Sequence, residues 1–187
     1  MKKLILLCTL AAFSLLPACS KIKQLANINV DLPFSQQMQV PAVQGYTEGM
    51  QLPMGVTIPF PAIPVATNSK DFIATYNTAA NMIVDVDLKS LNFQITAPAT
   101  QNFDFMDTVQ LYISSKSQPE VLVAYKYGVP KSTQSIDFYT ITSVNLKNYF
   151  VEDTMYFRIS AHVNAIPASG TNLKLSSVLH VLANPLN

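Results

Sequence analysis

The feature that most constrains the fold is a period-two alternation of apolar and polar residues in the second half of the chain. From residue 83 onward, Val84, Val86 and Leu88 alternate with acidic and basic residues, and similar runs recur up to residue 182. Successive side chains of a β-strand point to opposite faces of its sheet, so this alternation predicts strands with one buried face. Turn residues separate the runs about every 8–12 positions, which favours an antiparallel sandwich over a parallel α/β sheet.

The sequence therefore predicts an all-β fold, an antiparallel immunoglobulin-like β-sandwich of about seven to nine strands. The alternation changes phase by one residue at Lys89-Ser90, which is the signature of a β-bulge, and we expect a second phase change near Ser176-Ser177. The expected strands lie within residues 27–32, 83–95, 109–113, 121–127, 136–140, 155–163 and 173–182.

One or two short helical connections are expected between the strands. Residues 67–71 combine cap-type side chains with an acidic first turn, and apolar residues follow at three- and four-residue spacing up to Ile83. Residues 144–150 are compatible with a second helical turn.

Residues 33–66 form a proline- and methionine-rich segment. Six of the twelve prolines lie between residues 33 and 64, and each removes a backbone donor, so this stretch is restricted to edge strand, polyproline-like chain or loop. Two interpretations stay open. The segment is either an interrupted edge strand or hairpin over residues 51–60, packed on the sandwich, or an adaptable methionine-rich surface for a partner.

The first 18 residues have the three parts of a secretory signal peptide. Lys2 and Lys3 form a basic start, residues 4–16 are apolar, and small residues follow. The apolar run is shorter than the roughly 20 residues of a permanent membrane span. Leu16-Pro17-Ala18-Cys19 resembles the bacterial lipobox, and this resemblance implies cleavage before Cys19 and acylation of its thiol.

The predicted organisation is a signal peptide over residues 1–18, a lipidated Cys19 with a tether to residue 30, and one sandwich domain over 31–187. Cys19 is then the single thiol of the mature chain, and two or three acyl chains hold a protein stably at a membrane. Ser20 replaces the aspartate typical of inner-membrane retention. We therefore expect a cell-envelope protein, anchored in the outer membrane and facing the periplasm.

Composition argues against a nucleic-acid partner. Without Lys2 and Lys3, ten basic residues face eleven acidic ones, and charged residues make up only 12% of the chain. A nucleic-acid-binding domain needs a basic surface, which this near-neutral balance does not predict.

No catalytic or metal-binding constellation stands out, so we expect neither an enzyme nor a cofactor. A hydrolase triad needs a nucleophile, a base and an orienting group, but His162 and His180 are the only histidines and fall on separate predicted strands. Two histidines alone make a weak metal site. The acidic pairs suit solvated strand faces and turns better than glycoside hydrolysis or calcium binding; these pairs are Asp85 and Asp87, Asp104 and Asp107, and Glu152 and Asp153.

Tyrosines offer the one candidate ligand surface. Tyr125 and Tyr127 are two residues apart and share a sheet face if their strand is regular, so they are the candidate residues for stacking on a sugar or other small ligand. The other tyrosines considered for such a platform are Tyr46, Tyr112 and Tyr139.

The strand patterns of residues 86–98, 102–114 and 153–159 resemble those of small uncharacterised Bacteroidota lipoproteins. The wider shape is similar to immunoglobulin-like sandwiches, including the water-stress domain of late-embryogenesis proteins. This resemblance implies a fold and no activity, because such sandwiches host many functions.

Three functions follow as expectations, in this order. The first is a lipid-anchored, non-enzymatic accessory or interaction module with a protein partner in the envelope. The second is a glycan- or small-ligand-binding lipoprotein that uses Tyr125 and Tyr127. The third is a carrier of an apolar ligand, suggested by the 49% hydrophobic content.

Overall fold

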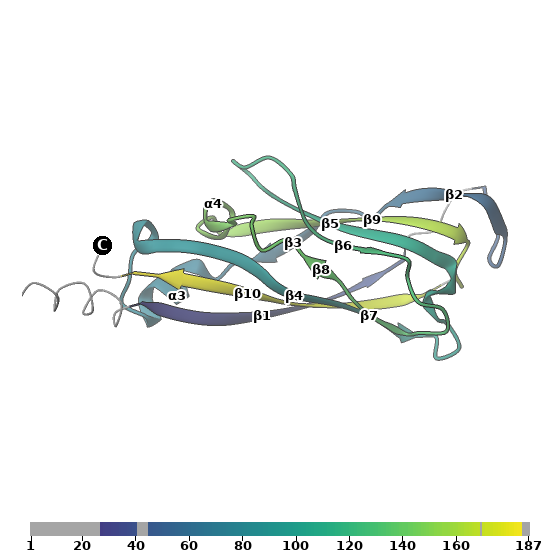
Figure 1. Ribbon diagram of the computed structural model, residues 1–187, viewed down its shortest axis with the longest axis horizontal. Helices are drawn as coiled ribbons and strands as arrows, with labels where there is room; N and C mark the ends of the chain where they lie inside the picture. The colour runs from purple at the N-terminus through teal and green to yellow at the C-terminus, as the bar shows by residue number, and fades with distance from the viewer. Residues whose placement is uncertain (1–26, 41–44, 169, 185–187) are drawn as a thin grey trace, which may run out of the picture.

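The computed structural model describes residues 27–40, 45–168 and 170–184. The predicted signal peptide, Cys19 and most of the predicted tether therefore lie outside the described residues. The described chain folds into two antiparallel sheets packed face to face, which confirms the prediction of an all-β sandwich (Figure 1).

Sheet A has four strands and sheet B has six. In sheet A the order is β1 (Ile28–Gln39), β10 (Asn172–Ala183), β4 (Ile83–Ala97) and β7 (Ser135–Asp137). In sheet B the order is β2 (Gln51–Pro59), β9 (Thr154–Ala165), β5 (Met106–Ser115), β6 (Val121–Tyr127) and β8 (Tyr139–Thr140), and β3 (Ile63–Ala66) also pairs with β9.

The hydrophobic core lies between the sheets and follows the predicted alternation. In β5, Val109, Leu111 and Ile113 are fully buried, while the residues between them are partly exposed. Each buried aliphatic side chain contributes about 1.5–3 kcal/mol relative to an exposed one. The inward positions of the central strands therefore determine which face of each sheet meets the other.

The predicted bulge in β4 is confirmed. Opposite β10, Ser90 pairs with Val178 and Leu88 pairs with Leu179, so Lys89 is the extra residue, and the phase of burial changes there. The predicted phase change near Ser176-Ser177 is wrong. Burial alternates without interruption along β10, because Ser177 itself points inward at 2% exposure and occupies a core position.

The proline-rich segment 33–66 supplies one edge of each sheet. Pro33 lies in β1, which pairs only with β10, and β2 and β3 lie end to end beside β9. A proline has no N–H to donate and suits a strand whose outer side is unpaired, where it also blocks edge-to-edge aggregation. This confirms the interpretation of residues 51–60 as an edge strand.

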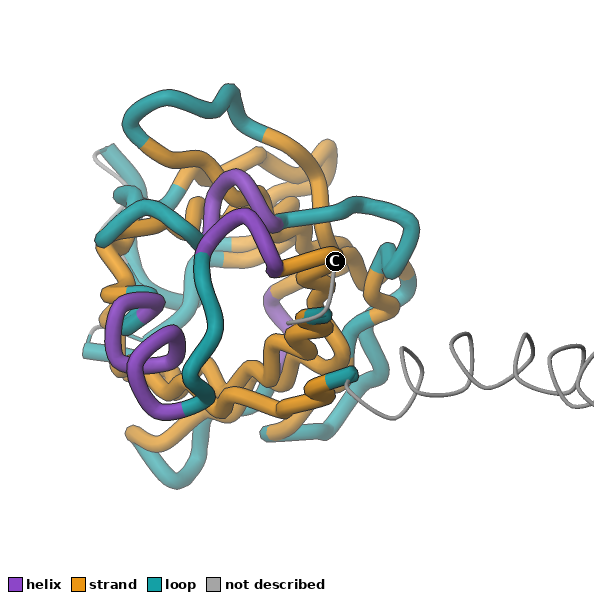
Figure 2. Tube along the Cα trace, turned by 90° about the vertical axis from the view of Figure 1, so that its left-hand side faces the viewer, coloured by secondary structure: helices purple, strands orange, loops and turns teal. Residues whose placement is uncertain are grey.

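The two expected helical connections are present and short. The helix α3 (Ser69–Thr75) buries Phe72, and α4 (Lys147–Phe150) buries Tyr149 and Phe150. The helix expected from the apolar spacing up to Ile83 is shorter, because α3 ends at Thr75 and is followed by a turn and the 3₁₀ helix η1 (Ala80–Met82). A second 3₁₀ helix, η2 (Phe103–Phe105), precedes β5. Figure 2 views the sandwich from the end at which α3 and α4 lie.

The predicted strand over residues 136–140 is two strands. The chain pairs with β4 as β7, passes through Phe138, and then pairs with β6 as β8 in the other sheet. Phe138 packs on Phe93 of β4, with ring centroids 4.9 Å apart. The segment therefore connects the two sheets along one side.

The sandwich has two distinct ends. Ile28 at the start of β1 pairs with Ala183 at the end of β10, so both described ends of the chain lie together (Figure 1). We call this the tether end. Gln39, Asn172 and Ala97 lie at the opposite end, together with the turn before β2 and the loop after β9. We call this the far end.

Candidate binding surfaces

Five of the eight tyrosines gather on the outer face of sheet B. Direct cross-strand partners share a sheet face, and in β5 and β9 every second residue is buried, which assigns the residues between them to the outside. We call these outward side chains the tyrosine face: Tyr112, Tyr125, Tyr127, Tyr139 and Tyr156.

Three of these rings lie side by side at the β6–β8 edge. The ring centroids of Tyr125 and Tyr127 are 4.8 Å apart, and those of Tyr125 and Tyr139 are 5.8 Å apart, with interplanar angles near 35°. These values fall in the range of favourable aromatic pairs. Tyr127 is 56% exposed and Tyr139 is 62% exposed, so the rings are held by each other while their surfaces meet solvent.

Hydrogen bonds join the trio to the centre of the sheet. Gln110 of β5 accepts a bond from the Tyr112 hydroxyl (3.1 Å), and its amide nitrogen donates to the Tyr127 hydroxyl (3.5 Å). The guanidinium of Arg158 lies 4.5 Å from the centroid of Tyr112, a cation–π distance. The tyrosines are thus fixed by strand pairing and by side-chain contacts.

Arg158 and Glu120 on the face compensate one another, and Lys126 lies at its edge. Arg158 forms a two-pronged ion pair with both carboxylate oxygens of Glu120. The hydrogen bonds from Arg158 hold the pKa of Glu120 below its usual range, and the same bonds raise the pKa of Arg158. Lys126 lies at the edge, with its ammonium 5.1 Å from the Tyr139 centroid.

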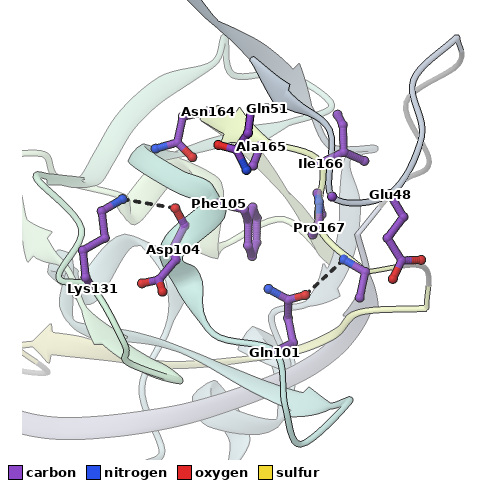
Figure 3. A pocket seen from close by; sticks show the side chains of 12 residues that line it. Glu48, Gln51, Gln101, Asp104, Phe105, Lys131, Asn164, Ala165, Ile166 and Pro167 are labelled. Atoms are coloured by element: carbon purple, nitrogen blue, oxygen red, sulfur yellow. Dashed lines mark hydrogen bonds between the residues drawn. The ribbon is translucent and has the colours of Figure 1, made fainter. Parts of the chain in front are cut away.

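A second candidate site is an open pocket of about 510 Å³ at the far end, within the usual size range for a small-molecule site. It lies between η2, the start of β2 and the loop after β9, with Phe105 at its base (Figure 3). Lys131 donates to the Asp104 carbonyl oxygen, and the Ala168 N–H donates to Gln101. These bonds connect lining residues of the pocket to one another.

The two histidines lie on the outer faces of different sheets, with the core between them. His180 of β10 has Nδ1 2.8 Å from a carboxylate oxygen of Asp31, which also pairs with Lys89. The hydrogen bond from Lys89 and then that from His180 lower the pKa of Asp31. His162 of β9 lies against Gly55 of β2. The sequence prediction that the histidines do not share a strand is confirmed.

The acidic pairs have local partners. Asp85 and Asp87 share the outer face of β4, where burial raises the pKa of Asp87. Asp104 accepts the N–H of Ser132, and Asp107 accepts from Asn164. These contacts match the interpretation of the pairs as strand-face and turn acids.

Glu152 and Asp153 hold neighbouring segments. The Glu152 carboxylate accepts bonds from Ser115 at the end of β5 and from Lys116 and Ser117 in the loop after it. Bonds from the Ser115 and Ser117 side chains are the main cause of its lowered pKa. Asp153 pairs with Lys70 of α3 at 2.8 Å.

The structure brings Tyr125 and Tyr127 together as the sequence suggested and adds neighbours to them. Tyr139 joins the pair through β6–β8 pairing, a contact between residues 14 positions apart in the chain. Tyr156 was not among the predicted surface tyrosines. It lies between the buried residues Met155 and Phe157 in a clear strand, so its side chain points to the outer face. Tyr46 lies in the turn before β2, outside the tyrosine face.

Two further observations concern the described residues only. Within 27–40, 45–168 and 170–184, no group of three or more His, Cys, Asp or Glu side chains is arranged to hold a metal ion. None of the helices in these ranges is long and apolar enough to cross a membrane.

Comparison with known proteins gives no family. No family model and no curated protein matches the chain. Among solved structures, a chain of Desmodium yellow mottle tymovirus is similar at 16% identity, covering 86% of this chain and 85% of that chain, with a TM-score of 0.29. A likeness at this TM-score carries no argument about the fold or function of the chain.

Proposed function

We propose that the protein is a lipid-anchored, non-enzymatic interaction module of the cell envelope, and that it binds its partner through the tyrosine face. The observation that carries the proposal is the gathering of five of the eight tyrosines on one outer sheet face. Folding requires inward apolar residues, and it places no such demand on outward positions. Large aromatic side chains kept on a solvent-facing surface are therefore a sign of binding.

The geometry of the chain suits a tethered module. The predicted anchor at Cys19 lies nine residues before Ile28, where β1 begins at the tether end. The tyrosine face runs along the side of the sandwich, on strands β5, β6, β8 and β9. A partner in the envelope would reach this face without displacing the tether.

The anchor is tested by fractionation. We expect the wild-type protein in the membrane fraction and the Cys19→Ala variant in the soluble fraction, because one thioether-linked diacylglycerol holds the protein at the bilayer. Wild-type protein in the soluble fraction, or the variant retained in the membrane, would refute the lipid anchor.

The binding surface is tested by affinity purification of the full lipidated protein from detergent-solubilised envelopes, followed by mass spectrometry. The triple variant Tyr125→Ala/Tyr127→Ala/Tyr139→Ala is compared with Gln94→Ala, an exposed position on sheet A. We expect a stoichiometric envelope protein with the wild type and Gln94→Ala, and its loss with the triple variant. Equal recovery with all three proteins would exclude the tyrosine face as the protein-binding surface.

An apolar-ligand carrier is a weaker candidate. A groove of about 240 Å³ between β1 and α3 is lined in part by Leu32, Phe34 and Phe72. This volume is below the usual range for a small-molecule site. Lipid that copurifies with the protein and is lost on Phe34→Ser would support the carrier.

A further inference from the structure

We infer that the ligand of the tyrosine face is a neutral polysaccharide, whose sugar rings stack on Tyr125, Tyr127 and Tyr139. This inference rests on the proposed function, since it names the class of ligand for the same surface. Three observations carry it: the packing of the rings, the polar residues beside them on β5 and β9, and the pairing of Arg158 with Glu120.

The three rings pack against one another as a cluster that keeps solvent-exposed surface. Their centroids are 4.8 Å and 5.8 Å apart, and the planes are tilted by about 35° to one another. The electron-rich face of an aromatic ring attracts the weakly positive C–H groups on the apolar face of a pyranose. The exposed surface of this tyrosine cluster suits contact with the apolar faces of linked sugar units.

The polar residues of β5 and β9, beside the rings, suit a hydroxyl-rich ligand. In the two central strands, the outward positions of β5 and β9 carry no aliphatic side chain between residues 108 and 114 or between 156 and 162. These positions hold Thr108, Gln110, Tyr112, Ser114, Tyr156, Arg158, Ser160 and His162.

This composition suits a glycan as the ligand. A ligand that covers the face has to satisfy the amide and hydroxyl groups it buries, because each one left unsatisfied weakens binding. A polysaccharide offers a hydroxyl donor and acceptor at nearly every ring carbon and matches such a surface.

The charges on the face favour a neutral ligand. Arg158 is already engaged by both carboxylate oxygens of Glu120, so an acidic sugar would have to displace this ion pair. Lys126 lies at the margin over Tyr139. The stacking positions themselves are three phenol side chains.

The surface is also organised before binding. Tyr125 and Tyr127 are on one strand, Tyr139 is paired with Tyr125 across β6–β8, and Gln110 bonds to two tyrosine hydroxyls. Side chains that are already ordered lose little further entropy when a ligand binds. A weak contact repeated along a polymer then suffices for measurable affinity.

The experiment is native affinity electrophoresis of the lipidated full-length protein in detergent. Separate gels contain amylopectin or galactomannan as neutral probes and polygalacturonate as an acidic probe. We expect retardation by at least one neutral polysaccharide, and weaker retardation or none by polygalacturonate.

Three variants locate the site. Tyr125→Ala/Tyr127→Ala/Tyr139→Ala should weaken binding by roughly tenfold or more, whereas the matching triple Tyr→Phe variant keeps the rings and should retain most of the affinity. Tyr46→Ala/Tyr76→Ala removes two partly exposed tyrosines outside the face and should bind as the wild type does. Unchanged thermal unfolding of each variant confirms that the fold is intact.

The outcomes separate the two proposals. No retardation by either neutral polysaccharide, stronger retardation by polygalacturonate, or binding that survives the triple alanine variant overturns the glycan inference. If glycan binding is absent while an envelope protein is lost with the triple alanine variant, the interaction module stands and its ligand is a protein. If glycan binding is present but no envelope protein is recovered, the glycan inference stands and the protein partner falls.

Discussion

The outer faces of the two sheets differ in chemistry although they enclose one core. Sheet A presents a charged row across three strands, in which Asp31, His180 and Asp87 are direct cross-strand neighbours. Sheet B presents the tyrosine face. Since both sheets satisfy the same inward pattern, the difference lies in positions that folding leaves free, and function is the better explanation for it.

The ion pairs of the two faces differ in the same way. On sheet A, Asp31 binds Lys89 and His180, which spreads charge over the strands. On sheet B, Arg158 pairs with Glu120 and lies on the Tyr112 ring, and Lys126 lies over the Tyr139 ring at the edge. The charges of sheet A thus contact one another across strands, whereas the cations of sheet B contact aromatic rings.

The largest expected effect concerns what the faces share. Phe157→Ala in sheet B and Phe93→Ala in sheet A each remove a fully buried ring and should each lower the free energy of unfolding by about 3–5 kcal/mol. Urea denaturation measures both. A small effect in one sheet only would mean that the two sheets do not contribute equally to one core. The comparison of their outer faces assumes that they do.

A smaller effect is expected at Gly55, beside His162 on sheet B. Its φ is +63°, and an added Cβ would overlap the imidazole and lie 3.1 Å from the Val163 carbonyl oxygen. We expect Gly55→Ala to cost about 1–3 kcal/mol. Gly128→Ala is the matched control, because it has a similar φ of +60° and open space around it. Equal losses would show that His162 exerts no constraint, and a second change, His162→Ala, should recover part of the difference.

Glu120 on sheet B and Asp87 on sheet A should respond to pH with opposite signs. The pKa of Glu120 is lowered by Arg158, so its stabilisation is present above its unfolded value of about 4.5 and is lost as the pH falls through the lower folded pKa. The pKa of Asp87 is raised by burial, so its contribution is full below about 3.8 and is lost as the pH rises through the folded pKa.

Thermal unfolding between pH 3 and pH 7 measures this contrast. Compared with the wild type, Glu120→Gln should be destabilised most at neutral pH, and the difference should shrink toward pH 3. Asp87→Asn should gain stability relative to the wild type as the pH rises. The same sign for both variants would contradict the assignment of opposite pKa shifts.

The smallest effects are expected at exposed outward positions. Tyr139→Ala on sheet B and Gln94→Ala on sheet A should each change the free energy of unfolding by less than about 1 kcal/mol, because neither side chain is buried. A cost of several kcal/mol at Tyr139 would indicate a structural role and weaken the case that the tyrosines are kept for binding.

The alternation of residues predicted the strands well because it reports directly on burial. The extra residue at Lys89 was visible as a phase shift, and the edge position of residues 51–60 followed from the missing N–H groups of proline. Ser177 was misread because a serine at an inward position looks like a break in the pattern. The split at Phe138 was also invisible, since a strand that changes sheets keeps its alternation.

The candidate site was predictable only in part. Tyr125 and Tyr127 lie two positions apart, and their proximity follows from the pleat of a single strand. The contacts of Tyr139 and of Arg158 with Glu120 depend on which strands pair and in which register, and neither is encoded locally. The far-end pocket combines four separate loops or strand ends, and no sequence pattern marked it.

The uninterrupted strand β1 gives the length of the sandwich. Its 12 residues span roughly 40 Å at the rise of an extended strand, from the tether end to the far end. If Cys19 holds the protein at the bilayer, the far-end pocket lies at the end of the sandwich away from the anchor. The tyrosine face lies along the side of the sandwich between its two ends, so a chain held at the tether end would keep the exposed rings accessible.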